Sequence, residues 1–311
     1  MRSLHYKLFS RYALLLLAII VSFMVALYIL LGNSLQNSAV SELQADCAHL
    51  GTLLHTRVGQ MNDLSKRIVS SRQLGSLFLR DIYSDDPAAY DQKMLFSDTL
   101  FDIIKLSFDN MELNILDTFG RHIHVGNVST FRILDEEALA GTEWFPVVLE
   151  AYGRPGVLPT HVPDFANRPT PVISFCRAFS PGGVREETAV LELQLQYSHL
   201  QQKIRHALYD SEERKKVYIY DRQGTLVYPY DAAPDAGVEE ELKAALDFAV
   251  KRESAHIFRP ASQSSRLYAC KHSALADWVV VVAASERELL TSFYQFQTLI
   301  LIVSVLVLAL A

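Results

Sequence analysis

The stretch LNILDTFGRHIHVG (113–126) has the pattern of a β-hairpin, and VYIYDRQGTLVYP (217–229) repeats that pattern later in the chain. In both stretches, two apolar runs flank an Asp-x-x-Gly sequence. The glycine can supply the positive φ that such tight turns often need, and the aspartate can accept hydrogen bonds from backbone amides inside the turn. The repeat predicts two modules in tandem, each with a sheet that begins at its hairpin.

Similar helical and strand patterns surround the two hairpins in the same order, the second time in abbreviated form. The first module is expected to contain a helix over 84–108 with Pro87 near its first turn, the hairpin, a helical stretch over 135–156, a polar, proline-rich loop over 157–171, and strands over 171–180 and 187–200. The second is expected to contain the hairpin, a helix near 237–251, and strands around 254–260, 266–273 and 277–285. Leu200, Ile204 and Leu208 share one face of a helix over 198–208 that bridges the modules.

A long helix is expected ahead of the first module, because residues 34–83 contain no proline and their apolar residues recur every seven positions. Arg57 is the single break in the second of the two series. The two series are Val40, Cys47, Leu54, Met61 and Ile68, and Leu43, Leu50 and Leu64. We expect this seam to pack against its own domain and also to support a homodimer.

An apolar stretch near the N-terminus predicts a membrane span. Residues 13–32 have Ser22 as their only clearly polar side chain, and a helix needs about 20 such residues to cross a bilayer core. The basic residues of 1–11 are accompanied by no acidic residue, so that segment should be cytoplasmic. We interpret 12–33 as an uncleaved transmembrane helix; a cleaved signal peptide is the alternative.

The C-terminal residues 293–311 predict a second, incomplete span, preceded by aromatic residues typical of a membrane interface. Because the sequence stops on apolar residues, we expect it to be truncated before a cytoplasmic part. Residues 34–292 would then be extracellular or periplasmic, in a multi-pass protein of a bacterial plasma membrane. They divide into the long helix with a membrane-distal module (34–205) and a membrane-proximal module (206–292).

Charge and cysteine content exclude two other classes. A net charge of −6 argues against nucleic-acid binding, which favours a basic surface. Three cysteines, Cys47, Cys176 and Cys270, are an odd number for an oxidising compartment, so we expect small buried side chains rather than disulfides. His122 and His124 share a strand face and could bind a metal as a pair, but no third ligand is evident nearby, so we expect an exposed strand face and no metal.

The expected fold class is α+β, with a long N-terminal helix and two tandem PAS-like antiparallel sheets between membrane helices. Taken in order, these elements resemble the double Cache sensor domain of bacterial receptors, and most closely the extracellular part of sensor histidine kinases. The resemblance covers nearly the whole chain, but each motif is loose by itself. The stretches that carry it are TEWFPVVLEAYG (142–153), PVISFCRAF (171–179), AVLELQLQYSHLQQKI (189–204), VYIYDRQGTLVY (217–228) and DWVVVVAASERELL (277–290).

The resemblance implies a small-molecule pocket in the membrane-distal module. Its expected lining is Trp144, Phe145, His161, Asp164, Phe175, Arg177 and Gln194. Aromatic walls would bury the apolar part of a ligand, and a few polar groups would orient it. As alternatives, Trp144 and Phe145 could be core residues, and Arg177 could pair with a nearby acid. The amino-acid-binding subgroup has an arginine where this chain has Thr142 and an aspartate where it has Gln194, so an amino-acid ligand is disfavoured.

The function that the resemblance implies is ligand sensing, most readily for a two-component histidine kinase. The same module could serve a chemoreceptor, a cyclic-dinucleotide enzyme or a membrane-bound transcription regulator, or the modules could be an adhesion or scaffold ectodomain that senses nothing. No sequence pattern of a catalytic site is present, so the chain as given is expected to be no enzyme and to need no cofactor.

Overall fold

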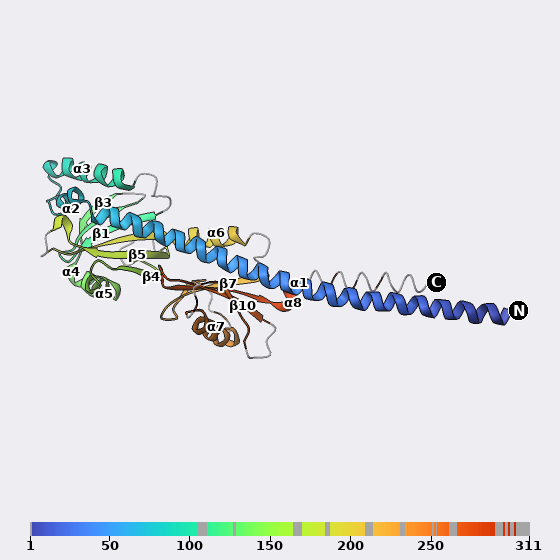
Figure 1. Cartoon of the computed structure of the whole chain (residues 1–311). Coiled ribbons are helices and arrows are strands. Elements are labelled where there is room, and N and C mark those ends of the chain that lie inside the picture. The colour runs from blue at the N-terminus through green and yellow to red at the C-terminus, as the bar shows by residue number, and fades with distance from the viewer. Residues whose placement is uncertain are drawn as a thin grey trace.

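The computed structural model describes residues 2–104, 111–126, 129–163, 170–183, 187–208, 214–230, 236–250, 254–260 and 266–289, together with positions 234, 252, 295, 298 and 302. Helix α1 (Arg2–Val69) runs the length of the molecule and lies against two sheets (Figure 1). Within these described residues, no helix has both the length and the hydropathy that a membrane span requires.

The predicted seam of α1 is its contact face. The buried side chains of α1 largely follow the two heptad series. They include Leu43, Cys47, Leu50, Leu54, Met61, Leu64 and Ile68. They share one continuous core with the sheets of the same chain. The prediction that the helix packs against its own domain is therefore confirmed, and this packing occupies the seam.

The long helix ends earlier than the predicted Tyr83. Ser71 begins a new helix, α2 (Arg72–Phe78), because its hydroxyl accepts a hydrogen bond from the amide of Leu74 at 3.3 Å. Gly75 of α2 packs directly on Gly182, so the short helix lies against a turn of the first sheet.

The first sheet has six antiparallel strands in the order β3-β2-β1-β6-β5-β4. They are β1 (Met111–Asp117), β2 (Arg121–Val125), β3 (Thr130–Ile133), β4 (Pro155–His161), β5 (Val172–Phe179) and β6 (Ala189–Gln196). The helices of this part are α3 (Pro87–Ile104), α4 (Glu136–Ala140) and α5 (Trp144–Glu150), and η2 (Pro181–Gly183) follows β5. The expectation of a loop over 157–171 is wrong in part, because residues 157–161 belong to β4. Pro159 is tolerated there because β4 is an edge strand with a bulge between Leu158 and His161.

The second sheet has five antiparallel strands in the order β8-β7-β11-β10-β9. They are β7 (Lys215–Asp221), β8 (Leu226–Tyr228), β9 (His256–Phe258), β10 (Arg266–Ser273) and β11 (Trp278–Ser285). Helix α6 (Tyr197–Ala207) joins the sheets, α7 (Ala236–Ala249) covers the second sheet, and α8 (Glu286–Leu289) follows β11. In each sheet the last strand pairs with the first strand of the hairpin, so the predicted repeat is confirmed.

The two hairpin turns have the same hydrogen bonds. Asp117 Oδ1 accepts from the amides of residues 119 and 121 at 3.0 and 2.8 Å, and Asp221 Oδ1 accepts from those of 223 and 225 at 2.9 and 2.7 Å. Gly120 and Gly224 have φ of 78° and 84°, which L side chains rarely adopt. The Asp-x-x-Gly sequence therefore forms the turn as expected.

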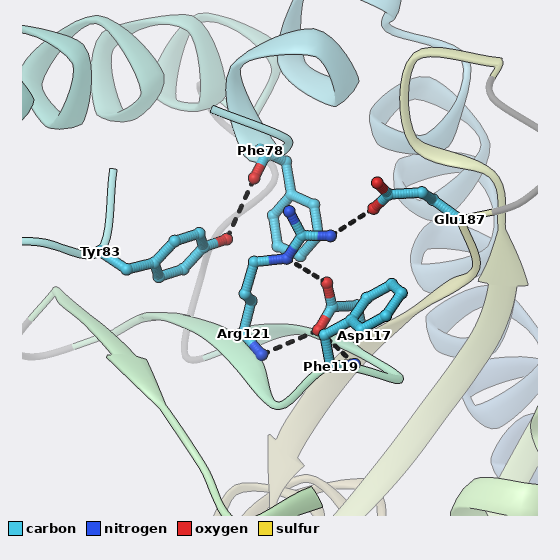
Figure 2. Close-up of polar contacts among 6 residues, drawn as sticks. All are labelled: Phe78, Tyr83, Asp117, Phe119, Arg121 and Glu187. Carbon is cyan, nitrogen blue, oxygen red and sulfur yellow. Dashed lines mark hydrogen bonds and ion pairs between the residues drawn. The ribbon is translucent and has the colours of Figure 1, made fainter. Parts of the chain in front are cut away.

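The first hairpin turn is also fastened to α2 (Figure 2). The guanidinium of Arg121 donates to the carboxylates of Asp117 and Glu187, and it lies 5.6 Å from the Phe78 ring centroid and 5.5 Å from that of Phe119. Burial raises the pKa of Asp117, and the ion pair with Arg121 acts against that shift. This network joins the end of α2, the hairpin and the start of β6.

The two sheets also contact each other directly. Thr160 of β4 donates a hydrogen bond to the carbonyl oxygen of Val227 at 2.6 Å, and the Tyr197 hydroxyl accepts from the amide of Tyr230 at 2.9 Å. On α1, Glu42 and Asp46 each bind the buried ammonium of Lys215 at 2.6 Å. The three cysteines are free and buried, as predicted.

Candidate functional site

Each sheet has an inner face toward α1 and an outer face on the opposite side, because side chains alternate along a strand. On the outer face of the first sheet, α4 and α5 cover one half (Figure 1). That half is apolar, and its buried residues are Leu116, Leu139, Phe145, Val148, Cys176, Ala178 and Val190. The other half carries polar side chains, which we call the polar cluster: Glu112, Asn114, His122, His124, Arg132, His161, Ser174, Glu192 and Gln194.

A buried carboxylate lies at the centre of the polar cluster. Glu192 is 4% exposed, and its Oε1 accepts from Ser174 Oγ at 2.6 Å and from Gln194 Nε2 at 3.0 Å. Its Oε2 accepts from Asn114 Nδ2 at 2.9 Å. These donors are all neutral. Burial of a carboxylate without a cation is costly, so the three hydrogen bonds are required to hold it there.

Two histidines bind the other end of Asn114. Its Oδ1 lies 3.0 Å from His122 Nε2 and 2.9 Å from His124 Nδ1, and Arg132 Nε donates to His122 Nδ1 at 3.0 Å. Burial, with help from the charges of Arg132 and His124, lowers the pKa of His122 to about 3. Burial also lowers the pKa of His124. The sequence expectation of an exposed strand face for these residues is wrong, because His122 is buried within the network.

The cluster reaches the surface at two places. His161 is partly exposed on the edge strand β4, and its Nε2 lies 3.4 Å from Ser174 Oγ. At the β2 side, His124 and Glu112 are partly exposed, with 4.0 Å between Nε2 and Oε2. The cluster therefore has a partly exposed member on each side.

The outer face of the second sheet is different, although its five strands follow the same order as β2-β1-β6-β5-β4 of the first sheet. The residues buried on this face are apolar or tyrosine, including Tyr218, Tyr268 and Val281, and they pack against Leu242 and Ala245 of α7. In Figure 1, α7 lies on the side of its sheet opposite α1, as α5 does for the first sheet. Only the first sheet therefore keeps a group of buried polar side chains on this face of the described structure.

The structure distributes the predicted site residues over three environments. Phe145 is buried in the apolar half, and Trp144 packs edge-on against it at 5.7 Å between ring centroids. Phe175 and Arg177 point to the inner face, where Arg177 donates to Ser65 at 3.0 Å and Asn62 at 2.6 Å on α1. Asp164 lies outside the described residues.

His161 and Gln194 are the two predicted site residues that the structure places in the polar cluster. Sequence reasoning missed its central residues, Glu192, Ser174 and Asn114. A signal was present, because LELQLQ (191–196) has polar residues at alternate positions and PVISFC (171–176) has the single polar residue Ser174 in an otherwise apolar strand. The described residues hold no group of three or more His, Cys, Asp or Glu side chains placed to bind a metal ion.

No family model and no curated protein matches the sequence. Solved structures are similar in fold. The extracellular domain of vpHK1S-Z8, which carries a histidine kinase designation, has a TM-score of 0.58 at 11% identity, over 84% of this chain and 96% of that one.

Two further structures extend the likeness. A domain from a Vibrio parahaemolyticus protein designated as sensory box/GGDEF family has a TM-score of 0.59 at 12% identity, over 82% of this chain and 99% of that one. The ligand-binding domain of the Campylobacter jejuni chemoreceptor Tlp3, solved with L-norvaline, has a TM-score of 0.51 at 12% identity, over 82% and 94%. This chain therefore has the fold of the double Cache sensor domains of bacterial receptors.

Proposed function

We propose that this chain is the ligand-sensing part of a membrane receptor, and that its ligand binds at the polar cluster on the outer face of the first sheet. The observation that carries this proposal is the contrast between the two outer faces. In the second sheet, α7 fills that face with apolar contacts, whereas the first sheet keeps buried polar groups there. Polar groups in a partly apolar setting are what a small-molecule site needs for orientation and specificity.

The elements that would carry the signal follow from the packing. Helix α1 lies against both sheets, and α8, which follows the last strand, meets it where Gln36 Nε2 donates to Glu286 Oε1 at 2.6 Å. A ligand that binds one arrangement of the first sheet more tightly shifts the population toward it, by no more than its differential affinity. The receptor would be a homodimer. The predicted membrane helices over 12–33 and 293–311 would transmit the conformational change across the bilayer.

We favour a histidine kinase as the output, with a chemoreceptor, a cyclic-dinucleotide enzyme or a membrane-bound regulator as alternatives. Fusion of residues 1–311 to a kinase core, followed by a screen of small molecules for changed autophosphorylation, tests the sensor function. Reporter fusions at each end test the topology, and both ends should be cytoplasmic. A non-sensing adhesion or scaffold ectodomain would give no response to any compound.

The site is tested with matched variants of the full chain. Gln194→Leu removes a donor from the polar cluster, and Gln223→Leu makes the same change at an exposed turn position. A compound that raises the melting temperature of the unmodified chain should do so in Gln223→Leu and lose most of its effect in Gln194→Leu. An undiminished effect in Gln194→Leu and in a second cluster variant, Ser174→Ala, would place binding elsewhere.

A further inference from the structure

The hydrogen bonds of Asn114 fix which nitrogen of each histidine carries a proton. Asn114 Nδ2 lies 2.9 Å from a carboxylate oxygen of Glu192, which accepts hydrogen bonds, so the amide oxygen must face the other way. His122 Nε2 and His124 Nδ1 both lie within 3.0 Å of that oxygen. Each of these nitrogens must therefore be the protonated one of its ring.

This assignment leaves two acceptors facing each other. In neutral His124, the remaining nitrogen, Nε2, has a lone pair, and it faces Glu112 Oε2 across 4.0 Å. Among the described residues neither atom has another hydrogen-bond partner, and the two side chains are 24% and 27% exposed. A donor that reached this gap from solvent would bind both atoms at once.

Gly126 lies beside the gap. A Cβ atom at this position would lie 3.1 Å from both Glu112 Cγ and His124 Nε2, closer than nearly all real contacts of a Cβ. The absence of a side chain at Gly126 therefore leaves room next to the two acceptors.

The charges around the gap favour a cation. Glu112 and Glu192 point to this face of the sheet, while the guanidinium of Arg132 donates to His122, on the other side of Asn114. The sheet has two other arginines: Arg121 is paired with Asp117 and Glu187, and Arg177 is bonded to α1 on the inner face. Two carboxylates, Glu112 and Glu192, and one guanidinium, Arg132, act on His124, so an anionic ligand group would meet more negative than positive charge here.

We propose that Glu112 Oε2 and His124 Nε2 together bind two N–H donors of one organic cation, a primary ammonium or a guanidinium, at the β2 side of the polar cluster. This inference rests on the proposed ligand site and specifies the chemical class that the site takes. The ligand group donates one hydrogen bond to a carboxylate and one to a neutral imidazole, and it adds positive charge beside the buried carboxylate of Glu192.

The test is calorimetric titration of the full chain with putrescine and agmatine, which are cations with N–H donors. Choline, a cation without N–H donors, and succinate, a dianion, are the chemical controls. At least one of the first two should bind, and choline and succinate should bind about tenfold more weakly or not detectably, as expected for loss of a charge-assisted hydrogen bond.

Variants locate the binding. Glu112→Gln removes the charged acceptor, and Gly126→Ala keeps both acceptors but fills the space beside them; each should weaken binding about tenfold or more. Asp98→Asn removes a carboxylate from an exposed position of α3 and should leave the affinity unchanged. Circular dichroism should show that the variants keep the fold of the unmodified chain.

Three results would overturn the inference: no binding of either N–H cation, equal binding of choline, or affinity that is unchanged in Glu112→Gln. Tight binding of zinc ion alone that needs both residues and excludes putrescine would also overturn it, as a metal site. The proposed function fails by a different result, namely that no compound changes the autophosphorylation of the kinase fusion. If succinate or another compound binds and Ser174→Ala or Gln194→Leu abolishes this binding, the ligand site stands and only the cation class is lost.

Discussion

Arg177 and Glu192 lie on adjacent strands of the first sheet, yet their side chains point to opposite faces of it. Arg177 donates to Ser65 and Asn62 of α1 and to the carbonyl oxygen of Gly153 at 2.5 Å. Glu192 is surrounded by neutral donors on the outer face. The arginine therefore fastens the sheet to α1, and the carboxylate belongs to the candidate ligand site.

Arg177→Leu should lower the free energy of unfolding without changing ligand recognition. The variant leaves the acceptors of Ser65, Asn62 and Gly153 without their donor, and a loss of about 2–3 kcal/mol is expected for a partly buried group of this kind. Denaturant unfolding followed by circular dichroism measures it, with the exposed Arg154→Leu as the control. If the Arg177→Leu chain folds but no longer responds to ligand, Arg177 would have to be assigned to the binding site.

Gly75→Ala should be strongly destabilising although alanine favours helices. The added Cβ would lie 2.1 Å from the backbone nitrogen of Gly182, so α2 or the turn after β5 must move, at about 3 kcal/mol. Gly59→Ala is the matched control in α1, because its Cβ would meet only Leu275 Cδ2 at an ordinary 3.6 Å. That change should stabilise the chain by up to about 1 kcal/mol. Equal melting temperatures for the two variants would contradict the close packing of α2.

His122 should make stability depend on pH below its ordinary pKa. The folded chain holds this pKa at about 3, down from 6.5, so between these values the unfolded state binds a proton that the folded state does not. Stability is then fully present above pH 6.5 and decreases as the pH falls toward 3, by at most about 1.4 kcal/mol per pH unit for one proton.

His122→Gln tests this dependence. Unfolding free energies measured from pH 7 to pH 4 should fall less steeply in the variant than in the unmodified chain, and the contribution of His124 should remain, because burial lowers its pKa as well. His49→Gln, at an exposed position of α1, is the matched control. An unchanged slope in His122→Gln would mean that His122 is not kept neutral in the folded state.

The sequence was sufficient to predict the repeated hairpins and the seam of α1, because both depend on local chemistry. Asp117 and Gly120 form their turn with atoms a few positions away, and the heptad series needs only a helix with an apolar partner. The break at Ser71 was missed because it depends on a single serine that caps the next helix. The strand over 155–161 was missed because proline weighs against strands except at edges, and edge position is a property of the whole sheet.

The candidate site was predicted less well for a physical reason. Side chains at neighbouring positions of a strand point to opposite faces, so Phe175 and Arg177 could be assigned to the same face as Gln194 only by guessing the register between β5 and β6. The cluster around Glu192 unites residues of β1, β2, β5 and β6. The sequence shows the polar positions of each strand, but only pairing brings them together.

Lys215→Met should loosen the second sheet from α1. Its ammonium is buried between Glu42 and Asp46, which would be left facing each other without a cation. Because both acids are partly exposed, the expected loss is moderate, about 1–2 kcal/mol, and salt should reduce it. Lys216→Met, at the next and exposed position, is the control, and denaturant midpoints at low and high salt measure both. If the two variants had the same denaturant midpoint, the ion pairs of Lys215 would have no net stabilising effect.

Since a single helix provides the wall for the inner faces of both sheets, the tandem repeat is not a pair of separable building blocks. A fragment that began after residue 205 would carry Ile219, Val280 and the rest of an apolar face with nothing to cover them. Such a fragment should aggregate when it is expressed alone, and adding residues 34–69 as a separate peptide should rescue its solubility. The folding unit is thus the helix together with both lobes.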